Sequence, residues 1–153
     1  MQRIPFVLLF LLIFSVSICA QDNPDPGWKT FALTDFFLYQ YSADQMTRTS
    51  QGTLIFQVKI SPTVEGLIDL RAREEVITYR RNSHQSIKGY ERWGHSLIQY
   101  EVQCSQRKYR VLSWADYKET GSKLDSQSPT GDWRDVDLES VAGAMLTKVC
   151  NSK

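Results

Sequence analysis

The chain has 153 residues, with 18 basic and 17 acidic side chains and a formal net charge of +1. This length favours a single domain. The near-neutral charge argues against a nucleic-acid-binding protein, which normally carries a basic surface, and against charge-driven attachment to anionic membranes. We therefore expect no nucleic-acid partner.

The N-terminus has the order of a secretory signal peptide. Arg3 supplies the positive charge, Phe6–Phe14 is an unbroken apolar run, and small residues follow up to Ala20. The apolar stretch over 4–20 falls short of the roughly 20 residues that a transmembrane helix needs. We expect residues 1–20 to be removed and the protein to be exported.

Cys19 leaves an alternative to simple cleavage open. The segment before it loosely resembles a bacterial lipoprotein box, in which the cysteine carries lipid. Ile18 is bulkier than such a box prefers, which favours cleavage after Ala20. Only the lipidated form would attach the protein to a membrane.

The next elements predict the first strands of a sheet. Residues 21–27 are polar and proline-rich, which predicts a flexible leader before a single domain over 28–150. The β-prone run 28–41 predicts one or two strands. Over 53–60 apolar and polar residues alternate, as in a half-buried strand, and Pro62 follows its end.

Residues 65–81 change to helical periodicity. Ile68, Ala72, Val76 and Tyr79 recur on one helical face. The charged residues between them fit a solvated helix face better than a binding site. They are Arg71, Arg73, Glu74, Glu75 and Arg80.

A hairpin and a polar connection come next. Residues 82–94 predict a loop, while 96–104 and 109–117 alternate as the two strands of an antiparallel hairpin. The polar region 119–131 follows, with a short strand expected near 123–126.

The last element is an amphipathic helix over 138–149. Its apolar residues form one stripe at helical spacing, and either Asp137 or Ser140 can cap its start. The helix ends at Cys150. The stripe consists of Leu138, Val141, Ala142, Met145, Leu146 and Val149.

Two cysteines, Cys104 and Cys150, remain after loss of the signal. An even number of cysteines in an oxidising compartment predicts a disulfide. Two buried free thiols are the alternative.

The sequence contains no recognisable catalytic or metal-binding pattern. His84 and His95 lack the spacing of a metal site, and neither a phosphate-binding loop nor a nucleophile elbow is present. Asp116 or Asp135 could serve as an acid in a cleft, which keeps an enzyme as a third hypothesis. We expect no enzymatic activity, no cofactor and no metal.

Aromatic residues offer the candidates for partner binding. Trp133, on a loop, fits a buried plug of the core better than an exposed anchor. Tyr90 and Trp93, in the predicted loop before the hairpin, are the better candidates for exposed aromatic side chains that contact a partner.

The chain resembles the bacterial surface-adhesin protein E family. The resemblance is carried by 100–104 (YEVQC), 107–112 (RKYRVL), 131–134 (GDWR) and the terminal Val149-Cys150, with 39–41 (YQY) in an early strand. It implies an α+β fold in which a curved antiparallel β-sheet carries the C-terminal helix. The helix predicted at 65–81 departs from the family pattern.

The resemblance also implies a function. It suggests an exported protein of the bacterial periplasm or cell surface that binds extracellular or envelope proteins without catalysis, and that can form a homodimer. A periplasmic structural or accessory protein with no external ligand is the alternative. A family fold does not by itself carry an activity.

Overall fold

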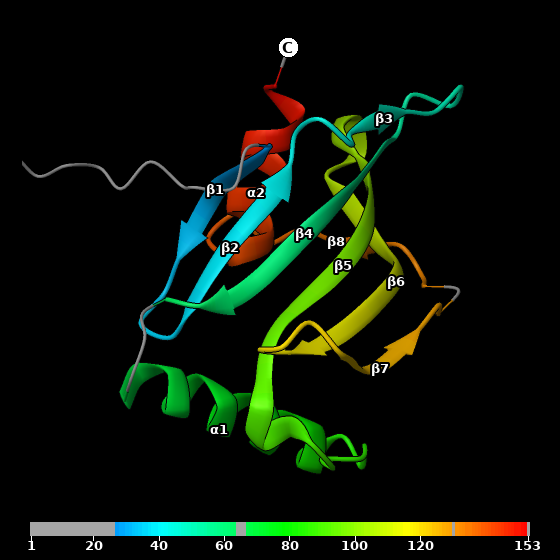
Figure 1. Cartoon of the computed structure of the whole chain (residues 1–153). Coiled ribbons are helices and arrows are strands. Elements are labelled where there is room, and N and C mark those ends of the chain that lie inside the picture. Colours follow the sequence, from blue (N-terminus) through cyan, green and yellow to red (C-terminus); the bar gives the residue numbers. More distant parts are fainter. Residues whose placement is uncertain (1–26, 64–66, 130, 153) are drawn as a thin grey trace, which may run out of the picture.

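The structure is a computed structural model that describes residues 27–63, 67–129 and 131–152. It combines an eight-stranded antiparallel sheet with two α-helices, which confirms the predicted α+β class. Figure 1 shows the two helices at opposite ends of a twisted sheet. The elements are β1 (Trp28–Leu33), β2 (Phe37–Ser42), β3 (Thr47–Arg48), β4 (Leu54–Pro62), α1 (Leu67–Asn82), η1 (Tyr90–Arg92), β5 (Trp93–Gln103), η2 (Cys104–Gln106), β6 (Lys108–Lys118), β7 (Lys123–Gln127), β8 (Arg134–Asp135) and α2 (Val141–Cys150), where η denotes a 3₁₀-helix.

The sheet follows the order β1-β2-β4-β5-β6-β7, with β3 beside β4 and β8 beside β6. The predicted hairpin is β5 and β6, and the predicted short strand is β7. The register of β4 against β5 runs from Leu54 opposite Val102 to Ile60 opposite Ser96. Alternate residues of these strands therefore share one face, which we call the helix face because both helices pack on it.

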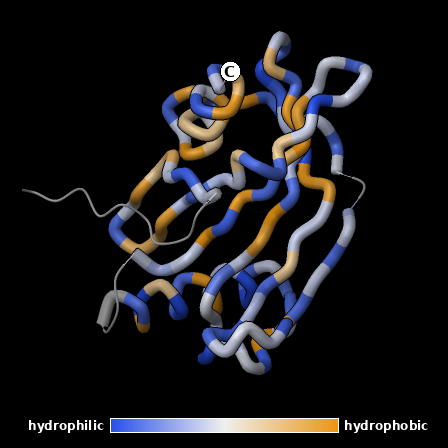
Figure 2. The backbone as a smooth tube through the Cα atoms, turned by 45° about the horizontal axis from the view of Figure 1, so that its top comes forward, coloured by the Kyte–Doolittle hydropathy of each residue, from blue (hydrophilic) through white to orange (hydrophobic). Residues whose placement is uncertain are grey.

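The alternation of apolar residues along the chain produces this arrangement. Figure 2 shows hydrophobic and hydrophilic residues alternating along the central strands. Leu54, Phe56 and Val58 are buried on the helix face, whereas the residues between them point to the opposite face. Sheets with one buried face show this pattern.

Two separate groups of buried residues form the core. The first lies between α2 and the sheet, and the second lies between α1, η1 and the start of β5. Burial of apolar surface stabilises each helix on the sheet. The first group is Phe31, Tyr41, Leu54, Phe56, Val58, Val102, Met145, Leu146 and Val149, and the second is Ala72, Tyr90 and Trp93.

The C-terminal helix begins later than its periodicity predicts. Ser140 is the N-cap, because its hydroxyl accepts a hydrogen bond from the Gly143 amide at 3.2 Å. Leu138 therefore lies outside α2 and is 52% exposed, so its predicted place in the apolar stripe is wrong. Asp137 binds the Glu139 amide instead, at 3.0 Å.

The disulfide between Cys104 and Cys150 is present, with 5.8 Å between the two Cα atoms. Cys104 begins η2 directly after β5, and Cys150 is the last residue of α2. The bond joins the end of the closing helix to the end of a central strand. Both residues border the core under α2.

The helix at 65–81 is confirmed as α1, but two of its side chains are placed differently from the prediction. Tyr79 is 68% exposed, whereas Arg80 is only 3% exposed. Ala72, Val76 and Arg80 are spaced by four residues, so they share the face of α1 that packs on the sheet. The face of α1 that packs on the sheet therefore carries the cation of Arg80.

The sequence-based expectations for the signal at 1–20, for Cys19 and for leader residues 21–26 lie outside the described residues. Within the described ranges, neither α-helix is long and apolar enough to cross a membrane.

Candidate functional site

A groove of about 500 Å³ lies between α1 and the helix face of the sheet. We call it the α1 groove. Its floor comes from four neighbouring strands, and α1 forms one wall. The lining residues are Phe37, Tyr39, Ile60, Glu75, Val76, Tyr79, Arg80, Gln85, Trp93, Ser96, Ile98, Val111, Trp114 and Asp116.

The floor of the groove follows from strand register. Tyr39 of β2 is opposite Ile60 of β4, and Ile98 of β5 is opposite Trp114 of β6. A bulge in β6 between Val111 and Ser113 keeps Val111 opposite Tyr100, so it stays on the helix face. These floor side chains are only half buried, since neither helix covers the middle of the face.

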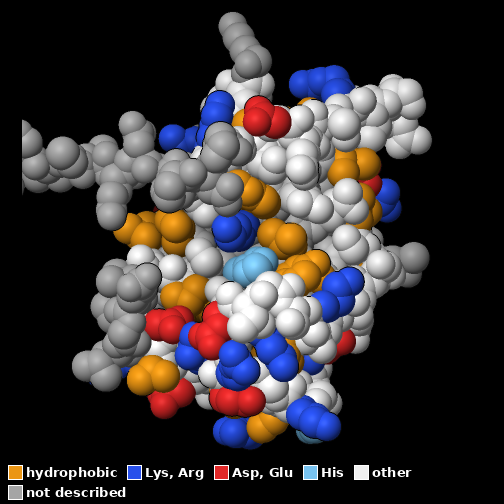
Figure 3. Space-filling view, viewed as in Figure 1, with side chains coloured by type: hydrophobic (Ala, Val, Ile, Leu, Met, Phe, Trp, Pro, Cys, Tyr) orange, Lys and Arg blue, Asp and Glu red, His pale blue; other side chains and the backbone are white. Residues whose placement is uncertain are grey.

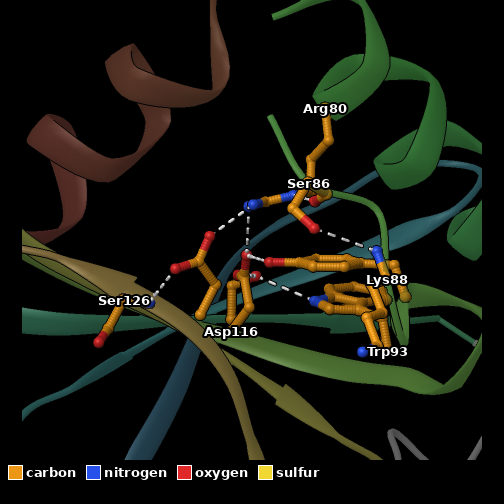
Figure 4. A network of polar contacts seen from close by, with 9 residues as sticks. Arg80, Ser86, Lys88, Trp93, Asp116 and Ser126 are labelled. Carbon is orange, nitrogen blue, oxygen red and sulfur yellow. Dashed lines mark hydrogen bonds and ion pairs between the residues drawn. The ribbon is translucent and has the colours of Figure 1, made fainter. Parts of the chain in front are cut away.

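The wall formed by α1 is amphipathic. Val76 faces the sheet, while Glu75 and Tyr79 are exposed at the mouth of the groove. Arg80 reaches down from the same helix to the sheet (Figure 4). An apolar floor therefore meets a mouth that carries a carboxylate.

A buried ion-pair cluster closes one end of the groove. Nη1 of Arg80 lies 3.2 Å from Oδ2 of Asp116 in β6, and Nη2 lies 2.5 Å from Oδ2 of Asp125 in β7. The side chains of Arg80 and Asp116 are 4% and 10% exposed. The guanidinium thus joins α1 to two strands.

All three guanidinium nitrogens of Arg80 donate hydrogen bonds. Its Nε donates to the Ser86 carbonyl oxygen at 2.7 Å, which fixes the chain just after α1. Its carbon lies 4.1 Å from the centre of the Tyr90 ring and 5.6 Å from that of Trp114. Stacking of a guanidinium on aromatic faces adds a cation–π attraction.

Hydroxyl groups satisfy the rest of Asp116. Tyr90 donates to Oδ2 at 2.6 Å, and Ser96 donates to Oδ1 at 2.5 Å. Trp93 in turn donates its Nε1 hydrogen to the Ser96 oxygen at 3.1 Å. Burial, together with the hydrogen bond to Asp116, raises the pKa of Tyr90 well above its usual value of 10, so this phenol stays protonated.

This geometry argues for a structural role of Asp116. Its two oxygens accept hydrogen bonds from two hydroxyls and a guanidinium. A general acid or base must be able to reach the proton that it moves. The hydrogen bonds from Arg80, Tyr90 and Ser96 occupy the two oxygens of Asp116 that a substrate would have to reach. The other candidate acid, Asp135, is exposed on β8, 3.8 Å from the Lys108 ammonium, and does not line the groove.

The described residues hold no group of three His, Cys, Asp or Glu side chains that could bind a metal ion. His84 is exposed in the loop after α1. His95 lies on the opposite face of the sheet, where its ring stacks on Tyr117 at 4.9 Å. The structure does not bring the two histidines together.

Tyr90 and Trp93 are each 1% exposed, so the predicted exposure of these rings is wrong. They pack with Ala72 beneath α1, because α1 covers the segment that we expected to be a free loop. The sequence analysis did not predict that Arg80 belongs to the buried ion-pair cluster, because its charge suggested exposure to solvent. Its spacing of four residues from Val76, which places it on the face of α1 that packs on the sheet, was the signal that could have shown this.

Trp133 lies outside the two core groups and is half buried. Its ring centre is 4.7 Å from the guanidinium carbon of Arg110. Arg110 pairs with Glu101, whose carboxylate also accepts a hydrogen bond from Thr53. Burial favours protonation of Glu101, but the bonds from Thr53 and Arg110 outweigh it and lower its pKa.

On the face of the sheet opposite the helices, the described residues carry charges of both signs (Figure 3). Figure 3 shows hydrophobic, basic and acidic side chains intermixed on the face that it displays. This agrees with the near-neutral composition.

A family model for surface-adhesin protein E matches residues 39–151. The chain belongs to the surface-adhesin protein E family. The resemblance found in the sequence is therefore confirmed. No curated protein matches the chain.

A solved structure similar to this chain is that of Haemophilus influenzae protein E. The similarity covers 84% of this chain and 86% of that chain, with a TM-score of 0.52 and 9% sequence identity. At this identity the likeness concerns the fold alone. The part that matches the surface-adhesin protein E model contains every lining residue of the α1 groove except Phe37.

Proposed function

We propose that this chain is an exported bacterial envelope protein that binds other proteins and catalyses no reaction. The observation that carries the proposal is the match to surface-adhesin protein E over 39–151. The family's name describes an adhesin at a surface. The signal-like N-terminus and the disulfide fit an oxidising compartment outside the cytoplasm.

The arrangement of the groove supports binding over catalysis. Its buried carboxylate, on Asp116, is held by Arg80, Tyr90 and Ser96. The remaining lining is largely aromatic and aliphatic. Such a surface suits shape-dependent binding.

Retention on immobilised proteins tests the proposal. The mature protein is passed over extracellular-matrix proteins and over envelope fractions of a bacterium, with an albumin surface as the control. We expect retention on one of the first two surfaces and none on albumin. Failure of both to retain the folded protein would overturn the binding function.

We further propose that residues 28–150 form one exported domain after loss of 1–20. Intact-mass measurement of the mature protein distinguishes a chain that begins at Gln21 from a chain that keeps a lipidated Cys19. Sedimentation at several concentrations tests homodimer formation, which the family resemblance suggests.

A periplasmic accessory protein is the second candidate. Ile18 next to Cys19 favours it, since a poor lipoprotein box removes the simplest route to surface attachment. Protease treatment of whole cells separates the two candidates. Digestion of the protein supports a surface adhesin, and protection supports the periplasmic protein.

A further inference from the structure

We propose that the α1 groove receives a large apolar side chain of a partner protein that carries a basic residue beside it. The inference rests on the proposed binding function and names the site and the chemistry of the partner. It concerns the groove defined above, between α1 and the middle of the helix face.

The size and lining of the groove fit such an anchor. Its volume of about 500 Å³ is within the usual range for ligand sites. Ile60, Ile98 and Val111 are half buried on its floor. An apolar side chain placed there removes this surface from water, which is favourable, and aromatic anchors in pockets dominate many protein interfaces.

The groove is held in shape before any partner arrives. Its floor lies on paired strands, and α1 is fixed to β6 and β7 through Arg80, Asp116 and Asp125. Arg73 adds a second tie, because its Nε donates to the Trp93 carbonyl oxygen at 2.9 Å. A preformed site lowers the entropic cost of binding.

Charge selects the neighbour of the anchor. Among the described residues, the lining contains two carboxylates, on Glu75 and Asp116, and one cation, on Arg80. The hydrogens of Arg80 are directed to Ser86, Asp116 and Asp125, so its charge is compensated within the cluster. Glu75 is exposed at the mouth, where a partner's Lys or Arg would complement it.

A titration with short peptides tests the site. The full mature protein is titrated with acetyl-Ser-Lys-Phe-Lys-Ser-amide while tryptophan fluorescence is followed, since Trp114 lines the groove and the peptide has no tryptophan. We expect a saturable change. Replacing Phe by Ser should abolish it, and replacing both Lys by Glu should weaken binding roughly tenfold or more.

Two matched variants place the binding on the protein. Glu75→Lys should weaken binding of the basic peptide and improve that of the acidic one. Glu74→Lys makes the same change on an exposed neighbour that does not line the groove, so it should leave both unchanged. Tyr79→Ala and Leu70→Ala form a second matched pair. Tyr79 lies at the mouth of the groove, so its loss should weaken binding, whereas Leu70 is 53% exposed elsewhere on α1 and its loss should not.

The outcomes separate this inference from the proposed function. Equal peptide binding by Glu75→Lys and Glu74→Lys overturns the groove as the site. Retention on a matrix protein that Glu75→Lys does not reduce also overturns it, while the adhesion function stands. Loss of self-association in Glu75→Lys would assign the groove to a second copy and overturn the inference as well. Absence of any retention by the unaltered protein overturns the adhesion function, and the titration still decides whether the groove binds.

Discussion

Arg80 and Asp116 form a buried ion pair between α1 and β6, with 3.2 Å between Nη1 and Oδ2. The pair lies under the helix that walls the groove, and both side chains are almost fully removed from solvent. A buried pair of this kind adds little net stability compared with a well-packed apolar pair, but loss of one partner is expensive. The position of α1 therefore depends on both charges.

Replacement of Arg80 by Met should destabilise the fold by about 3–5 kcal/mol, the usual cost of breaking one side of a buried pair. The change leaves Asp116 and Asp125 close together without their shared cation. Urea unfolding, with the midpoint and slope measured together, gives the change in the free energy of unfolding.

Arg81→Met is the matched control, because Arg81 is the exposed neighbour in the same helix. A surface change of this kind should alter the free energy of unfolding by no more than about 0.5 kcal/mol. Equal effects of the two variants would show that the buried pair does not hold α1.

Loss of the Cys104–Cys150 disulfide should destabilise the protein by about 4 kcal/mol, since the bond spans 46 residues of sequence. The double variant Cys104→Ser with Cys150→Ser tests this by urea unfolding. Mass spectrometry without reductant should link the two peptides that contain these residues. Two free thiols in the exported protein would refute the bond.

Gly143→Ala should disrupt the start of α2. An added Cβ would collide with the Leu138 carbonyl oxygen, so the turn before Ser140 would have to move. We expect a loss of roughly 1–3 kcal/mol, as in overpacked cores. Lys148→Ala, an exposed change in the same helix, should have little effect; a stable Gly143→Ala protein would show that the turn adapts freely.

The free energy of unfolding should decrease as the pH is lowered below about 6.5, because of His95. Burial, with a further contribution from the positive charge of Lys59, lowers its pKa from 6.5, while Asp116 acts in the opposite direction. The unfolded chain then binds more protons than the folded protein, so stability present above pH 6.5 is lost as the pH falls through the folded pKa.

The measurement compares the urea midpoint at about pH 7.5 and about pH 5.5. His95→Gln should reduce the difference between the two midpoints. His84→Gln, on the exposed loop after α1, should retain it. An unchanged pH dependence in His95→Gln would assign the effect to other groups.

The sequence by itself determined the two helices and the long strands of the sheet. Apolar residues alternate with period two in β4, β5 and β6, and they recur at helical spacing in α1 and α2. Both patterns are local, because each reflects one face of the element that is removed from water. The resemblance to surface-adhesin protein E was also readable, since it rests on short segments around the two cysteines. The pairing of Cys104 with Cys150 followed from their number and compartment.

Only the tertiary structure decided which side chains meet. Tyr90 and Trp93 were expected to be exposed because nothing local shows that α1 folds back over them. Arg80 was expected in solvent because no carboxylate that could compensate its burial is recognisable nearby in the sequence. The two carboxylates that do so are supplied by β6 and β7, more than 30 residues further along the chain. The α1 groove has the same origin: its floor is assembled from four strands, and such non-local contacts leave no periodic pattern in the sequence.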